Sequence, residues 1–102
     1  AEKARTSVVD GVPVSLPPLT HAAKLLTRLA NAGQPAPIDP VSATAVRNLV
    51  AEGHDVSGIV LAAIAQMRAQ GLDPEAELRA KVQAFRAAIV DQETRIGQTS
   101  AD

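Results

Sequence analysis

The sequence predicts an all-α protein, a four-helix bundle preceded by an extended N-terminal linker. Apolar residues recur at intervals of three and four in four successive segments, as on one face of a helix. Asp-Pro pairs precede two of these segments, and a glycine follows each of the first three. Residues 8–14 could pair as a short strand, but Pro13 argues against it.

Length and composition indicate one small globular domain. The chain has 102 residues, of which 46% are apolar and 21% charged. Its only large aromatic residue is Phe85, so small aliphatic side chains must form the core. Each of these side chains buries little apolar area, and buried apolar area contributes only ~25 cal/mol per Å² to stability. We therefore expect marginal stability for the isolated chain and a surface that packs against a partner.

Charge and hydropathy exclude several classes of function. The net charge is −1, with no basic stripe or aromatic ladder, so we expect no nucleic-acid partner. No cysteine is present for a disulfide or a thiolate zinc site. The longest apolar run, residues 59–65, is far shorter than the ~20 residues of a membrane span. No signal peptide opens the chain, so we expect a cytoplasmic protein.

Residues 1–18 are predicted to be a linker that crosses a surface. Asp10-Gly11 is a turn pair. Prolines interrupt any helix there, at Pro13, Pro17 and Pro18. The charged start without an initiator Met suggests a fragment, and the linker would then come from an upstream domain.

The first helix is predicted from Pro18 or Leu19 to Asn31, because proline is tolerated at the first helical position. Gly33 ends it. Its expected core stripe is Leu19, Ala22, Leu26, Leu29 and Ala30.

The second helix is predicted to begin with Asp39 as N-cap and Pro40 as first residue, and to run to about Glu52. Gly53 ends it. Its expected apolar stripe is Val41, Ala45, Val46, Leu49 and Val50.

The third helix is predicted from His54 or Asp55 to about Gln70. Residues 56–65 are apolar on nearly every side of this helix, which is typical of burial on more than one side. A second subunit or a neighbouring domain would provide that burial in so small a chain.

The fourth helix is predicted to start after Asp73 as N-cap and to reach about Thr94. Its expected core stripe is Leu78, Val82, Phe85, Ala88 and Ile89. The helical domain would then cover residues 19–96, followed by a flexible polar tail at 97–102.

Several segments resemble the MazG family of nucleoside triphosphate pyrophosphohydrolases. The most specific are residues 7–13, Ser-Val-Val-Asp-Gly-Val-Pro, and residues 16–19, Leu-Pro-Pro-Leu. Residues 23–25, Ala-Lys-Leu, and 71–75, Gly-Leu-Asp-Pro-Glu, follow in the order that the family shows. The resemblance covers about residues 2–95 and implies a MazG-like bundle.

The resemblance also implies an activity, the Mg²⁺-dependent cleavage of a nucleoside triphosphate to a monophosphate and pyrophosphate. Mg²⁺ prefers oxygen ligands, and carboxylates three or four residues apart project from one helix face. Two such helices would hold the ions that bridge the phosphates and activate a water.

This chain departs from the family at that site. The segment matching the first acidic motif retains one carboxylate, Glu52. In the second motif Asp55 is the only aligned carboxylate, and Gly58 stands in place of the key Asp. Lys24 and Arg28 could bind a nucleotide phosphate or form a solvated helix face. We therefore expect no catalytic residue, metal ligand or cofactor in this segment.

The two histidines, His21 and His54, lie in different predicted elements, and neither has a partner at metal-ligand spacing. We expect surface or capping roles for both.

Three hypotheses about function follow. The segment is the C-terminal, non-catalytic part of a pyrophosphohydrolase, forming a homodimer or packing on an upstream MazG domain through helix 56–70. Alternatively, it is itself a weak Mg²⁺-dependent nucleotide-binding or hydrolysing unit that uses Asp55 with Glu52, Lys24 and Arg28. A helical adaptor unrelated to nucleotides is the third hypothesis.

Overall fold

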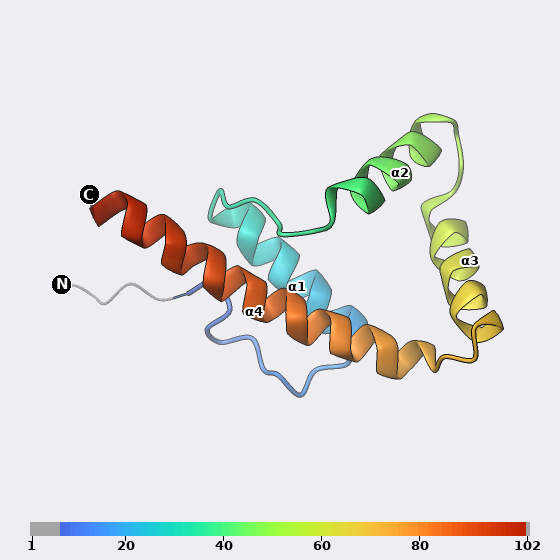
Figure 1. The fold of residues 1–102 in the computed structure, drawn as a ribbon, viewed down its shortest axis with the longest axis horizontal. Coiled ribbons are helices and arrows are strands. Elements are labelled where there is room, and N and C mark those ends of the chain that lie inside the picture. Colours follow the sequence, from blue (N-terminus) through green and yellow to red (C-terminus); the bar gives the residue numbers. More distant parts are fainter. Residues whose placement is uncertain (1–6, 102) are drawn as a thin grey trace. The chain divides into compact units, whose positions relative to one another are not determined.

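The computed structural model describes residues 7–101, with side chains to Gly97. Over these residues it contains four helices and no strand (Figure 1), which confirms the all-α prediction. The helices are α1 (Pro18–Asn31), α2 (Pro40–Ala51), α3 (Val56–Ala69) and α4 (Pro74–Ala101). None of the four combines the length and apolarity that crossing a bilayer requires.

Aspartate caps set the starts of the later helices, as the sequence predicts. The Oδ2 atom of Asp39 accepts a hydrogen bond from the backbone N–H of Ser42 at 3.0 Å. Asp73 Oδ1 similarly accepts from the N–H of Glu75 at 3.0 Å. Each carboxylate thereby satisfies a donor that has no partner within the first helical turn.

The last helix is longer than predicted. We expected it to end near Thr94, but α4 continues to Ala101 through Gly97. One glycine inside a helix costs only ~1 kcal/mol relative to alanine, so it need not end the helix. An ion pair between Asp91 and Arg95 supports the turn just before it.

The chain divides into two compact units. Among the described residues, the α1–α4 unit comprises residues 7–37 and 78–101, and the α2–α3 unit comprises residues 38–77. In the part of the chain that the structure describes, all of the buried hydrophobic side chains belong to the α1–α4 unit: Val8, Val9, Val12, Leu25, Leu29, Val82 and Ile89. The expected core stripe of the fourth helix is therefore confirmed at Val82 and Ile89, with Leu78 and Phe85 packed against the same cluster.

The buried face of α1 is offset from the predicted stripe. Its buried residues are Pro18, His21, Leu25 and Leu29. Leu19 is 67% exposed and Leu26 is 40% exposed. Leu29 is buried as predicted and Ala22 packs against the core cluster, but the buried face also includes His21 and Leu25, which the predicted stripe left out.

The segment before α1 is not a simple surface linker. Val8, Val9 and Val12 are buried at 7%, 6% and 3% exposure. Two turns fold this segment, with Asp10 N–H donating to Ser7 O and Val12 N–H to Val9 O, both at 3.1 Å. The predicted turn at Asp10-Gly11 is present. The segment nevertheless packs into the core, because burial of its three valine side chains is favourable. The predicted connection to an upstream domain concerns residues outside the described range.

The α2–α3 unit has no comparable core. Among the described residues, neither α2 nor α3 contains a buried side chain. Their large apolar side chains are exposed instead, and include Val41, Val46, Leu49, Val50, Val56, Val60, Leu61 and Ile64. The expected apolar stripe of the second helix thus exists, and its side chains are exposed.

Candidate functional sites

Arg86 of α4 holds the folded segment in front of α1. Its Nη1 donates to the carbonyl oxygen of Val12 at 2.7 Å, and its Nη2 donates to that of Val9 at 3.1 Å. The two backbone oxygens lie in a turn and lack helical partners, so a charged donor satisfies them. Sequence reasoning missed this role, because nothing in the pattern around Arg86 indicates which backbone it will reach.

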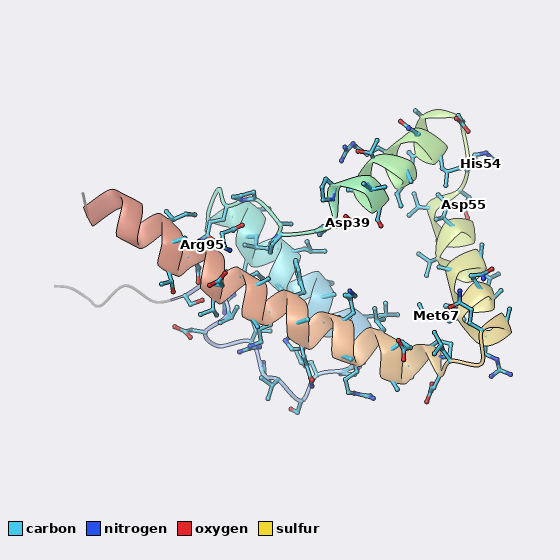
Figure 2. The ribbon with its side chains drawn as sticks, in the orientation of Figure 1. Asp39, His54, Asp55, Met67 and Arg95 are labelled. Carbon is cyan, nitrogen blue, oxygen red and sulfur yellow. The ribbon has the colours of Figure 1, made fainter. Side chains whose placement is uncertain are left out.

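His21 is a core residue and has no surface or capping role, which corrects the prediction. It is only 2% exposed, and its Nε2 lies 2.9 Å from Arg86 Nη1. Since Arg86 can only donate, Nε2 accepts, and the ring is neutral. Burial, and secondarily the positive charge of Arg86, lowers the pKa of His21. His54, by contrast, lies at the exposed turn before α3 (Figure 2), with its Nε2 3.8 Å from Glu52 Oε1.

Glu93 provides a second attachment of the same segment to α4. Its Oε1 accepts from the hydroxyl of Ser7 at 2.5 Å, and its Oε2 accepts from Val8 N–H at 3.1 Å. The same Oε2 accepts from Gln34 Nε2 at 3.0 Å, in the loop after α1. One carboxylate therefore joins both loops of the unit to the last helix.

An open cleft lies between residues 11–16 and α1. Both predicted nucleotide-binding residues, Lys24 and Arg28, line it. Its other polar lining residues also come from α1: Thr20, Thr27 and Asn31. No carboxylate is among the lining residues, so the cleft has a net positive charge.

The Arg28 side chain in this cleft lies against Gly11. Arg28 Nη1 donates to Val8 O at 3.3 Å. Gly11 has a φ of +84°, and a Cβ built on it would lie 3.0 Å from Arg28 Nη2. The left-handed backbone and the close guanidinium both favour glycine here. The sequence suggests the turn at Asp10-Gly11 but not the arginine that packs on it.

Asp55 is the N-cap of α3, at the turn shown in Figure 2. Its Oδ2 accepts from the N–H of Gly58 at 2.9 Å. This cap agrees with the predicted start of the third helix at His54 or Asp55. Within the described part of the chain, no three His, Asp or Glu side chains gather in a way that could hold a metal ion.

Comparisons of the chain with protein-family models, curated proteins and solved structures gave no significant match.

Proposed function

We propose that this chain is a non-catalytic helical domain that docks through its α2–α3 unit onto the same unit of a second copy. The observation that carries the proposal is the exposure of the apolar side chains of both helices. Leu61 is 68% exposed and Val56 is 52% exposed, although residues 56–65 are almost entirely apolar. Val56, Val60 and Ile64 follow one another at intervals of four, so they share one face of α3. An exposed apolar face is typical of a protein interface.

The energetics support a docked state. Isolated short helices are marginal in water, and most helical stability comes from packing an apolar face. Fully burying a Val, Leu or Ile side chain contributes about 1.5–3 kcal/mol. Burying even a few side chains of α3 would therefore offset much of the entropy lost on association.

The charges of α3 favour a second copy as the partner. Arg68 in the last turn is the only charged residue within this helix, and Asp55 caps its other end. Two copies of α3 packed antiparallel about a two-fold axis would bring each Arg68 toward the partner's Asp55 end. In the antiparallel arrangement, the positive end of each helix dipole would also lie beside the negative end of the other, which is favourable. Gly58, Ala62 and Ala65 would allow a close approach of the two backbones.

The resemblance to MazG enzymes gives this docking a biological setting. The chain would be the C-terminal part of a nucleoside triphosphate pyrophosphohydrolase, with the metal-binding carboxylates in an upstream domain. Docking would then join or support the active domains. The role of Asp55 as a helix cap supports this proposal, because its carboxylate is already bonded to backbone.

The oligomeric state tests the proposal directly. We expect sedimentation velocity of the purified chain to show a monomer–dimer equilibrium. Leu61→Glu should shift it to monomer, because it places a charge in the interface. Leu19→Glu is the matched control, since Leu19 is equally exposed at 67% but belongs to the α1–α4 unit.

Two results would contradict the proposal. One is a folded wild-type chain that stays monomeric at every concentration, which would favour docking on an upstream domain instead. The other is a Leu61→Glu variant that dimerises as well as Leu19→Glu.

The non-catalytic part of the proposal has a separate test. Purified chain is incubated with Mg²⁺ and a mixture of nucleoside triphosphates, and pyrophosphate is measured. We expect no turnover above a protein-free control. Robust turnover that Asp55→Ala abolishes would instead establish the alternative, a weak Mg²⁺-dependent hydrolytic unit.

A further inference from the structure

We propose that the cleft beside α1 binds the phosphate group of a small soluble ligand. This site lies within the α1–α4 unit and is independent of the docking proposed for α2 and α3. Its components are Lys24, Arg28 and the neighbouring polar side chains of one helix face.

The arrangement of α1 places these side chains together. Thr20, Lys24, Thr27 and Asn31 follow one another at intervals of four, three and four, so they share one face of the helix. Arg28 lies one turn after Lys24 on the same side. The opposite face is occupied by the buried residues of the core, which fixes the polar face toward the cleft.

The positive charge in the cleft is not neutralised within the described residues. The side-chain ammonium of Lys24 has no hydrogen bond or ion pair with any other described residue. Asp10 is the acidic residue of the adjacent turn, and its carboxylate accepts from the N–H of Ser7. A phosphate monoester carries a charge of about −1.5 to −2 at pH 7, which matches two cations.

Arg28 is already oriented for anion binding. One of its nitrogens is held by Val8 O at 3.3 Å, and Gly11 leaves room for the other. A guanidinium has five N–H donors, so several are left for phosphate oxygens. Holding the planar group in advance reduces the entropy lost when the ligand binds.

The remaining lining residues complete a phosphate site. Thr27 Oγ1 donates to Ala23 O at 3.0 Å, so its hydroxyl hydrogen is used within the helix and Thr27 is not counted as a phosphate donor. Thr20 and Asn31 add a hydroxyl and an amide as neutral donors. Val12 and Leu16 form an apolar wall that strengthens the nearby electrostatic interactions.

A titration followed by amide NMR tests this site, with inorganic phosphate, adenosine monophosphate and acetate as probes. We expect the largest shift changes at Gly11, Lys24 and Arg28 with both phosphate probes, and weaker binding of acetate. Tighter binding of adenosine monophosphate than of phosphate would identify a nucleotide ligand. Equal binding would identify the phosphate group alone, and either result supports the site.

Two lysine variants distinguish a specific phosphate site from nonspecific electrostatic attraction of phosphate to the protein. Lys24→Gln should weaken phosphate binding by roughly tenfold, as expected for loss of a charged hydrogen-bond donor. Lys81→Gln, which removes an exposed lysine of α4 that does not line the cleft, should leave it unchanged. Arg28→Gln should also weaken binding, but it removes the bond to Val8 as well, so Lys24→Gln is decisive.

The proposal is overturned if phosphate shifts no cleft amide more than those of α2 and α3. It is also overturned if Lys24→Gln binds phosphate as well as Lys81→Gln does. Neither result would bear on dimerisation through Leu61, so the two proposals fail separately.

Discussion

The α1–α4 unit and the α2–α3 unit have similar apolar sequence patterns and very different burial. In the first, Leu25 and Ile89 are completely inaccessible to solvent. In the second, Leu61 and Val41 are 68% and 76% exposed. Apolar periodicity therefore predicts where a helix forms, but it does not predict which surface will cover it.

The difference also separates two kinds of stabilisation. In the α1–α4 unit, the chain covers its own apolar residues and satisfies the carbonyls of a folded loop with Arg86. In the α2–α3 unit, caps and backbone hydrogen bonds define the helices, and no described side chain of either helix is buried. The predictions below test this contrast.

The largest contrast is expected for the loss of a leucine side chain in each unit. Leu25→Ala should lower the free energy of unfolding by about 2–5 kcal/mol, since it leaves a cavity at a fully buried position. Leu61→Ala should change it by about 0.5 kcal/mol or less in protein dilute enough to be monomeric. Urea unfolding followed by circular dichroism measures both, and equal losses would show that the two units share one core.

The next largest effect concerns the two arginines that contact their own unit. Arg86→Ala should cost about 1–3 kcal/mol, because Val12 O loses its charged donor and Val9 O keeps only the turn bond from Val12 N–H. Arg47→Ala removes only an exposed bond to Thr44 Oγ1 in α2 and should be nearly neutral. Thermal unfolding compares them, and a neutral Arg86→Ala would refute the attachment of this segment.

Removal of the cap of α3 should have a smaller effect. Asp55→Ala should cost about 1 kcal/mol, whereas Asp55→Ser keeps a capping oxygen and should cost less. Adding Mg²⁺ should leave the melting temperature of the wild-type chain unchanged. A Mg²⁺-dependent rise that Asp55→Ser removes would instead show that Asp55 is a metal ligand.

The smallest predicted effect is a dependence on pH that comes from one histidine. Burial lowers the pKa of folded His21 below its ordinary value of 6.5, so the unfolded chain binds a proton first as the pH falls. The stabilising contribution is complete above pH 6.5 and declines below it, toward the pKa of the folded state. His21→Gln should flatten the stability profile between pH 7 and about pH 5.

His54→Gln is the control for that titration, because His54 is exposed. This variant should retain the slope of the wild-type chain. A slope that survives in His21→Gln and disappears in His54→Gln would contradict the assignment.

The sequence alone predicted the helices better than their environments. Aspartate caps and following glycines are local signals, so the starts of α2 and α3 agree within one residue with Asp39 and Asp55 as caps. The end of α4 was predicted too early because no strong stop signal lies there. Burial of Val8 and His21 depends on contacts with α4 more than sixty residues away, which local patterns cannot encode.

The candidate cleft was predictable only in part. The spacing of Lys24 and Arg28 places both on one helix face, and that much follows from the sequence. The folded loop that forms the other wall depends on its attachment to Arg86 and Glu93. The separation of the chain into two units could not be inferred from periodicity either, since all four helices carry apolar stripes.

Hydrogen exchange measured over a range of protein concentrations tests the central claim most directly. If α2 and α3 are covered by a second copy, the protection of amides in residues 56–69 should rise with concentration. Protection of residues 21–29 in α1 should depend on it much less, because this chain covers them itself. Protection of α3 that is independent of concentration and as high as that of α1 would contradict the account.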